Sequence, residues 1–326
     1  MALSIVIPVF NSQETIGQLV EQLFDMPICD NLQVVLVDDG SADSSAKICE
    51  DLAQRFHGSV VFVQLARNFG EHNAVMAGLS YSRGEWVVVM DDDLQNPPEA
   101  VQLLYKAIRS EDYDVVYSRI AGKKDRRWRI AGSWFNNLVC TVMLRKPYGL
   151  YLSSFKIMSR FAVDQILAYR GPFPYIDGLL LQSVNRIGTI PVPHQERPGG
   201  KSSYTLLKLI GLWLSTFTNF SIFPLRLAFF LGLIGFVCGL LLVGSLIYER
   251  LTQSSFPTGF LMLMTTLVFF SSANLIVAGL VGEYVGRILL NVNGKPQFVV
   301  RKTVSHGENQ RDLEGEAIST SQVARR

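Results

Sequence analysis

The chain has 326 residues, of which 48% are hydrophobic and 18% are charged, and its formal net charge is +2. Four scattered cysteines, with no Cys-X-X-Cys pair, argue against a zinc site and against a disulfide framework, and they favour a reducing compartment. The first residues have neither the basic region nor the cleavage site of a secretory signal, so we expect the non-membrane part to stay in the cytosol.

Short β-branched runs alternate with helical patterns over the first 120 residues. We expect strands at residues 3–10, 32–39, 60–66, 86–92 and 114–118. These runs are almost continuously apolar, as is typical of parallel strands that are covered on both faces. The series therefore predicts an α/β fold with a doubly wound, mostly parallel sheet.

Two helix starts have recognisable capping residues. Asn11 is expected to cap a first helix, with Glu14 three residues on. Asn96 is expected to cap the helix after residue 93, with Pro97 at the first helical position and Glu99 closing a capping box.

An acidic triplet, Asp91-Asp92-Asp93, follows the fourth apolar run, and Asp38 and Asp39 end the second. Ligands bind at the carboxyl ends of such strands, so we expect both groups to face one crevice. Carboxylates without His or Cys suit a hard cation, Mg²⁺ or Mn²⁺, bound with help from substrate phosphate oxygens. Exposed loop acids are the alternative, which a lone pair would favour more than a triplet does. Strand alternation would place Asp92 on the side opposite Asp91 and Asp93.

Two apolar stretches, residues 227–248 and 260–281, are each long enough to cross a membrane as a helix. A buried core helix is the alternative, but two successive spans exceed the needs of a core of this size. Residues 203–226 are expected to form interfacial helices. Basic residues after the second span fit a cytosolic flank, so we assign residues 282–326 to a cytosolic segment and tail.

Several motifs together resemble one family. "IVIPVFNSQETI", "VDDGSADSS", "ARNFGEHNAVMAGLSYSRGE", "DDDLQNPPE", "SSFKIMSR" and "ERPGGKSSY" occur in order, followed by the paired apolar stretches. Together they resemble the GT-A domain of glycosyltransferase family 2, here residues 1–202. More narrowly they resemble its polyprenyl-phosphate glycosyltransferases, such as dolichyl-phosphate mannose synthase, bactoprenol glucosyltransferases and aminoarabinose transferases.

The resemblance implies roles for individual residues on the donor side. Asp91 and Asp93 match the metal-binding Asp-X-Asp, and Gln95 matches a residue that completes the metal shell. The donor nucleotide sugar is assigned to the following residues: Pro8, Asp38, Asp39, Arg67, Asp92 and Lys201. Arg197 matches an arginine on a loop that closes over the diphosphate, and it joins Asp91, Asp93 and Arg119 as a catalytic candidate.

On the acceptor side, Arg119 matches an arginine that meets the acceptor phosphate. It opens a basic stretch, residues 118–129, whose other basic residues are Lys123, Lys124, Arg126, Arg127 and Arg129. A solvated loop is one alternative for this stretch. Nucleic-acid binding is another, but no recognition helix or stacking platform accompanies it. Attraction to anionic headgroups and to a lipid phosphate is the interpretation that we favour.

The chain departs from the family pattern at three places. Ser203 stands where the last motif usually has a lysine, and Lys201 lies two residues earlier. Leu150 and Tyr151 stand where some relatives have an Asp that has been proposed as a base. Ser12 stands where the family often has Glu. His72, alone at a helix start, fits a structural or substrate-contact role better than proton transfer.

The resemblance thus implies a metal-dependent, inverting transferase that moves one sugar from a nucleotide-diphosphate sugar, with UDP-glucose favoured, to polyprenyl phosphate. The resemblance implies an integral protein of the bacterial inner membrane that faces the cytosol and forms a homo-oligomer, with a tetramer as one option. A processive polysaccharide synthase is a rival, but its Gln-X-X-Arg-Trp motif does not occur. A silent scaffold of the same fold is the non-enzyme alternative.

Overall fold

The computed structural model describes residues 2–29, 31–120, 150, 152–193, 259–293 and 296–305, with some positions between 230 and 248. The chain divides into two compact units. One contains Met1–Ser203 and Gly294–Arg326, and the other contains Tyr204–Asn293.

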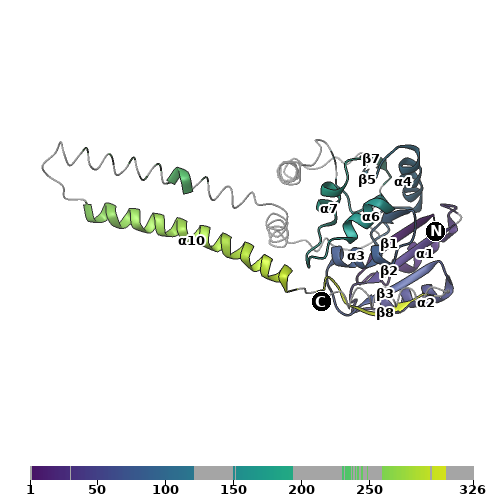
Figure 1. The fold of residues 1–326 in the computed structure, drawn as a ribbon. Coiled ribbons are helices and arrows are strands. Elements are labelled where there is room, and N and C mark those ends of the chain that lie inside the picture. The colour runs from purple at the N-terminus through teal and green to yellow at the C-terminus, as the bar shows by residue number, and fades with distance from the viewer. Residues whose placement is uncertain are drawn as a thin grey trace. The chain divides into compact units, whose positions relative to one another are not determined.

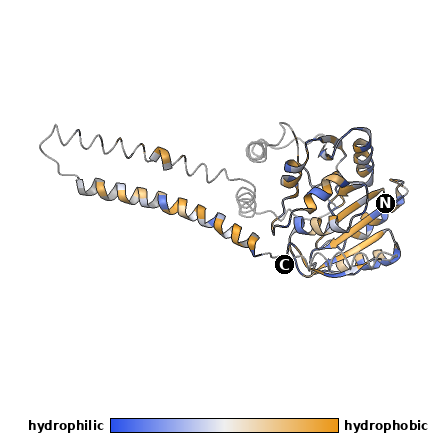
Figure 2. Ribbon diagram, in the orientation of Figure 1, coloured by the Kyte–Doolittle hydropathy of each residue, from blue (hydrophilic) through white to orange (hydrophobic). Residues whose placement is uncertain are grey.

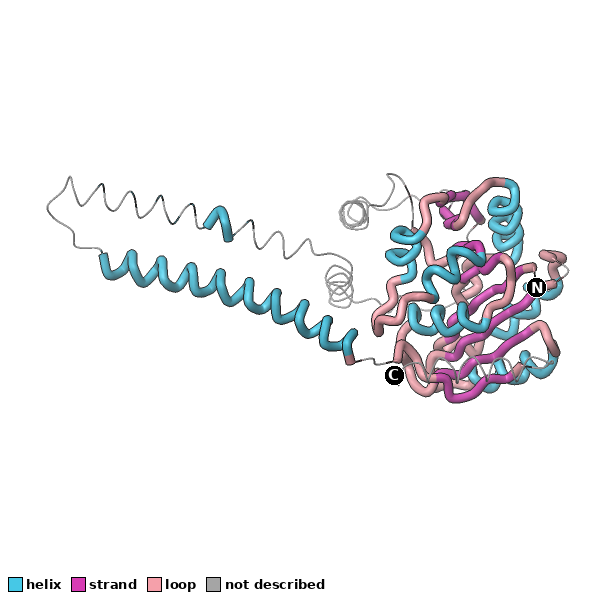
Figure 3. Tube along the Cα trace, viewed as in Figure 1, coloured by secondary structure: helices cyan, strands magenta, loops and turns pink. Residues whose placement is uncertain are grey.

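An eight-stranded sheet forms the centre of the first unit (Figure 1), with helices packed along it (Figure 3). Its spatial order is β7-β5-β6-β4-β1-β2-β3-β8. The strands are β1 (Leu3–Val9), β2 (Leu32–Asp38), β3 (Val60–Leu65), β4 (Trp86–Val89), β5 (Val115–Ile120), β6 (Lys156–Ser159), β7 (Ile187–Val192) and β8 (Val300–Val304).

The five strands expected from the sequence are confirmed as β1 to β5, and the sheet is mostly parallel. Strand β1 pairs in parallel with β2 and β4, β2 with β3, and β5 with β7. The sequence pattern does not predict β6, β7 or β8. Strand β6 runs antiparallel between β4 and β5, and β8 runs antiparallel along β3 at the sheet edge.

Helices cover both faces of the sheet. On one face, α1 (Ile16–Asp25), α2 (Ser45–Arg55) and α4 (Pro98–Ser110) enclose the main core with alternate strand residues. On the other face lie α3 (Glu71–Tyr81) and α6 (Arg160–Leu167), and α7 (Ile176–Ser183) packs against α6. Burial on both faces explains why the parallel strands are apolar at almost every position.

The predicted helix starts are wrong in detail. Helix α1 begins at Ile16 after Thr15. Asn11 instead has a positive φ of 55°, and its Oδ1 accepts a hydrogen bond from the Ala42 amide. Helix α4 begins at Pro98 and has no side-chain cap, so Asn96 does not cap it. The Asn11 side chain, which the local pattern assigns to capping, is instead engaged by the loop that follows β2.

Strand β4 is shorter than the predicted 86–92 and ends at Val89. Its partner β6 begins opposite, at Lys156, so the ladder stops there. Leu94 then adopts a φ of +60°, which turns the chain sharply. The acidic triplet therefore lies in a loop that follows the strand end.

The second unit contains α10 (Gly259–Val292), which includes the predicted span 260–281. The segment Phe269–Gly286 is long and apolar enough to cross a membrane, although a soluble core helix can pass the same test. Figure 2 colours much of α10 as hydrophobic, and Leu275 and Ile276 are exposed. The predicted span 227–248 lies largely outside the described residues, and residues 203–226 lie wholly outside them.

Candidate active site

Loops at the carboxyl ends of β1 and β2 hold each other through reciprocal hydrogen bonds. The Asn11 amide donates to Ser41 Oγ at 3.0 Å, and the Ser12 amide donates to Ser45 Oγ at 2.8 Å. In return, Gln13 Oε1 accepts from the Ser44 amide at 3.1 Å. The chain's own hydrogen bonds therefore fix these two loops relative to each other at the strand ends.

Asp38 and Asp39 end β2 and have different partners. Asp39 accepts hydrogen bonds from the amides of Phe69 and Gly70, at 2.7 and 2.9 Å, and so holds the loop at residues 67–70, here called the β3 loop. Burial, and then the charge of Asp38, raise the pKa of Asp39 against these hydrogen bonds. Asp38 is fully buried, and its Oδ2 has no hydrogen-bond partner among the described residues.

The three carboxylates of the triplet turn to different neighbours. Asp92 accepts hydrogen bonds from Ser12 Oγ and from the Phe10 amide, so it links the end of β4 to the β1 loop. Asp91 accepts a hydrogen bond from Ser154 Oγ at 2.6 Å, on the β6 side. Asp93 accepts one from the Gln95 amide at 3.1 Å. Burial is the main cause that raises the pKa of Asp92.

A cation would have to draw most of its ligands from outside this triplet. Among the residues that the structure describes, no three His, Cys, Asp or Glu side chains come close enough to hold a metal ion. Asp91 and Asp93 are two carboxylates of the loop that follows β4, one on the β6 side and one beside the Gln95 amide. Together with Gln95 they form an all-oxygen donor set, which fits Mg²⁺ or Mn²⁺ once phosphate oxygens complete the shell.

A buried ion pair lies beside the triplet, and the sequence pattern does not single it out. Lys156 Nζ of β6 contacts Asp177 Oδ1 in the first turn of α7, and both residues are buried. Tyr117 of β5 donates to the same Oδ1 at 3.0 Å. Lys156 belongs to the quoted motif "SSFKIMSR", but nothing in the sequence signals Asp177, which comes near only through the packing of α7.

The first turn of α3 also lies near the triplet and the Lys156–Asp177 pair. Desolvation, and then the negative charge of Asp91, raise the pKa of Glu71. Desolvation lowers the pKa of His72, whose ring makes an edge contact with Tyr175 at 5.5 Å between centroids. A neutral His72 fits the structural or substrate-contact role expected of it.

The remaining site candidates are only partly described. Pro8 lies in β1, and exposed Arg67 stacks over the Phe69 ring at 4.7 Å. Arg119 is exposed in β5, where strand alternation puts it on the face of Tyr117. The other basic candidates lie outside the described residues: Lys123, Arg126, Arg127, Arg129, Arg197 and Lys201.

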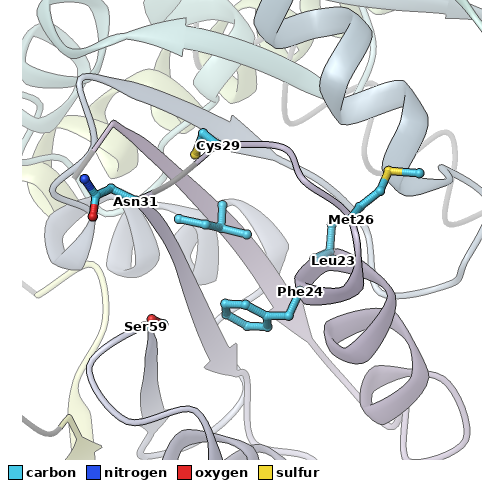
Figure 4. A pocket seen from close by; sticks show the side chains of 7 residues that line it. Leu23, Phe24, Met26, Cys29, Asn31 and Ser59 are labelled. Carbon is cyan, nitrogen blue, oxygen red and sulfur yellow. The ribbon is translucent and has the colours of Figure 1, made fainter.

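A pocket lies near the amino ends of β2 and β3, at the other end of the strands from the triplet (Figure 4). Its lining includes Leu23 and Met26 near the end of α1, Leu32 at the start of β2, and Ser59 just before β3. Ligands of doubly wound sheets bind at the carboxyl ends of the strands, so this pocket is separate from the candidate site.

Residues 4–167 match the family model described as glycosyl transferase family 2. A relative from Proteus mirabilis (strain HI4320) is 36% identical over 307 residues, which cover 92% of this chain and 93% of the relative. The chain belongs to glycosyltransferase family 2. A further relative, from Enterobacter sp. (strain 638), is 34% identical over 311 residues, covering 93% of this chain and 94% of the relative. Both are named undecaprenyl-phosphate 4-deoxy-4-formamido-L-arabinose transferase.

Membership of family 2 confirms the family that the motifs indicated and makes the chain a glycosyltransferase with a GT-A-like α/β fold. Among solved structures, S. aureus TarS 1–349 in complex with UDP-GlcNAc is similar with a TM-score of 0.44 and 22% sequence identity. That similarity covers 63% of this chain and 62% of TarS 1–349.

Proposed function

We propose that this chain transfers a single sugar from a nucleotide-diphosphate sugar to undecaprenyl phosphate, with inversion, at the cytosolic face of a membrane. The observation that carries the proposal is the carboxylate pair Asp91 and Asp93 beside the strand ends of a family 2 fold. The two relatives named for undecaprenyl phosphate align over 93% and 94% of their lengths. The apolar helix α10 suits a lipid substrate.

The nucleotide belongs on the β1–β3 side of the crevice in this proposal. The unpartnered, buried Oδ2 of Asp38 favours a ligand with N–H or O–H donors, because an unsatisfied buried oxygen costs free energy. Asp39 holds the β3 loop, which presents Arg67. Pro8 and the triplet's Asp92 border the same side, with Asp92 acting through Ser12.

The chemistry joins an acceptor phosphate oxygen to the anomeric carbon while the bond from that carbon to the nucleoside diphosphate breaks. Asp91, Asp93 and Gln95 would hold Mg²⁺ or Mn²⁺, which when bound neutralises charge on the leaving diphosphate. The acceptor phosphate is already ionised at neutral pH, so it needs alignment and no general base. Arg119 supplies that alignment through its two-pronged guanidinium group.

The sugar has two candidates. The relatives' names make 4-deoxy-4-formamido-L-arabinose the first, at 34–36% identity. Glucose, delivered by UDP-glucose, is the second and follows from the likeness of the motifs to bactoprenol glucosyltransferases. The two sugars differ at C4, where one has a formamido group and glucose has a hydroxyl, and glucose also has a hydroxymethyl group that the pentose lacks. A donor panel therefore separates them.

The test uses the full chain in detergent with undecaprenyl phosphate, Mn²⁺ or Mg²⁺, and a panel of nucleotide sugars, with the lipid product identified by mass. We expect one added sugar, whereas a polymer would favour the processive synthase. Asp93→Asn removes one charge and little volume, and should lower the rate by at least about a hundredfold. Transfer at the wild-type rate in this variant, or in excess chelator, would contradict the metal assignment. Absence of both transfer and donor hydrolysis would favour the scaffold.

A further inference from the structure

The segment that follows α10 belongs to the first unit and contacts the connection that leads from α6 to α7. Gln297 is half-buried, and its Nε2 donates to the carbonyl oxygens of both Tyr169 and Gly171, at 2.8 Å each. Tyr169 and Gly171 belong to the connection between α6 and α7. One amide group thus uses both of its hydrogens to hold this connection.

Two residues later the same segment holds the root of the β3 loop. The Ala66 amide donates to the Val299 carbonyl at 2.8 Å. Arg301 Nη2 contacts the Ala66 carbonyl at 3.4 Å. Between these contacts Val300 pairs with Leu65 as β8 begins (Figure 1). We call residues 297–301 the C-terminal clasp.

The clasp connects two segments near the candidate site, the α6–α7 connection and the root of the β3 loop. Residues 297 and 299 are at most roughly 7 Å apart along the chain, so the α6–α7 connection and Ala66 are held close together. Ala66 leads directly into the β3 loop, whose amides bind Asp39. The α6–α7 connection leads into Asp177, which binds Lys156 beside the triplet. We therefore expect the positions of the β3 loop and of the α6–α7 connection to depend on the clasp.

Attachment of an edge strand does not by itself require this arrangement. The pairing of β8 with β3 supplies backbone hydrogen bonds that hold the strand. Gln297 lies outside that ladder, and its side chain donates to two carbonyls of the connection that leads into Asp177. Its contacts restrict the α6–α7 connection relative to the β3 loop. Such restriction of binding loops improves ligand affinity, because less conformational entropy is lost on binding.

We propose that Gln297 is a positioning residue for the nucleotide sugar, acting through the β3 loop and the α6–α7 connection. This inference rests on the proposed function, because it takes the β3 loop to be on the nucleotide side. In this proposal the clasp, which follows α10, helps to position the donor-binding residues.

The test compares three variants of the full chain in detergent: Gln297→Ala, Gln297→Glu and, as the control, Lys302→Ala. Lys302 is the next residue after the clasp and makes an exposed ion pair with Glu50 at 2.5 Å. Isothermal titration calorimetry measures the binding of UDP and of GDP, each with Mn²⁺, well below the Tm of each variant. Kinetics then give KM for the nucleotide sugar and for undecaprenyl phosphate separately.

We expect Gln297→Ala to weaken nucleotide binding by about three- to tenfold, as follows from the loss of one or two neutral hydrogen bonds. Gln297→Glu should weaken it further, because a carboxylate would face two carbonyl oxygens. KM for undecaprenyl phosphate should stay within twofold of wild type, roughly the error of such a comparison, and Lys302→Ala should bind nucleotide normally.

The proposal is overturned if both Gln297 variants bind nucleotide as tightly as wild type, or if both substrates weaken equally. Should Gln297→Glu fail to fold, Gln297→Ala decides alone. A wild-type chain that forms the lipid-linked sugar while the Gln297 variants behave normally refutes the clasp and leaves the proposed function intact. A wild-type chain that binds neither nucleotide and forms no product refutes both.

Discussion

The three carboxylates of the triplet are adjacent in sequence but have different surroundings. Asp92 is committed to Ser12 and the Phe10 amide, across 80 and 82 residues of sequence. Asp91 and Asp93 each accept one described hydrogen bond. Three like charges in a row repel one another, and this division separates one charge from the other two. It also gives Ser12 a role, as the donor that stabilises the middle carboxylate.

Arg119 is the acceptor-side basic candidate that lies within the described residues. An arginine grips phosphate through two parallel hydrogen bonds, which a lysine cannot copy. We expect Arg119→Lys to raise KM for undecaprenyl phosphate by about tenfold and to leave KM for the nucleotide sugar unchanged. Arg119→Ala should lower kcat as well, because the attacking oxygen loses its alignment. Kinetics with each substrate varied in turn check this, and loss of donor affinity alone would move Arg119 to the nucleotide side.

The ionisation of His72 predicts the direction in which the stability of the fold changes with pH. Its pKa is lowered in the folded chain, first by desolvation. Its contribution to stability is therefore fully present above the ordinary value of 6.5 and is lost as the pH falls through the lower, folded-state pKa. His72→Gln cannot gain a proton, so we expect its Tm to fall less than that of wild type when the pH is lowered from 7.

Thermal unfolding of the full chain in detergent, measured at closely spaced pH values in chelator, tests this expectation. His57→Gln is the matched control, because His57 is exposed in the described structure. Identical pH profiles for wild type and His72→Gln would contradict the desolvation of His72.

At the scale of elements, the β3 loop depends on a close backbone approach. Gly40 has a φ of +73°, and a Cβ there would lie 2.7 Å from the Asn68 amide nitrogen and 2.8 Å from the Arg67 carbonyl carbon. Both contacts are to backbone, which cannot swing away as a flexible side chain can. The "VDDGS" glycine therefore lets the turn after β2 support the β3 loop directly.

We expect Gly40→Ala to destabilise the fold by about 1–3 kcal/mol and to weaken nucleotide binding, because the β3 loop must move. Gly70→Ala is the control. Gly70 also has a positive φ, +94°, but a Cβ there meets nothing within 4 Å. It should show conformational strain without displacement of the loop. Nucleotide titration and thermal unfolding check the pair, and equal losses of affinity would contradict the steric argument.

At the scale of the whole molecule, the first unit contains segments from both sides of α10 in the sequence. Strand β8 covers the β3 edge, where it pairs with Phe62, Val63, Gln64 and Leu65. An uncovered, apolar edge strand is a template for aggregation. The catalytic unit is therefore incomplete in any fragment that stops before residue 296.

A truncation that ends at Arg197 tests this dependence. We expect it to aggregate more and to unfold at a lower temperature than a fragment in which residues 296–305 are rejoined through a flexible Gly/Ser linker. Light scattering and Tm measure the difference. Two fragments that are equally soluble and equally stable would show that β8 is dispensable for the fold.

The sequence by itself determined the features that local patterns encode. Continuous apolar runs predicted β1 to β5, the triplet predicted carboxylates at a strand end, and apolar length predicted a helix long enough to cross a membrane within α10. Such signals are visible because neighbouring residues repeat with the period of the element they form.

Only the tertiary structure decided how distant segments meet. Strand β6 entered between β4 and β5 with the opposite direction, and β8 closed the far edge. Asp92 accepts a hydrogen bond from Ser12, and Lys156 forms an ion pair with Asp177. Gln297 donates a hydrogen bond to the Tyr169 carbonyl, 128 residues away. These pairings leave no periodic trace, because a single polar contact is chosen by which elements pack together and by the need to satisfy buried polar groups.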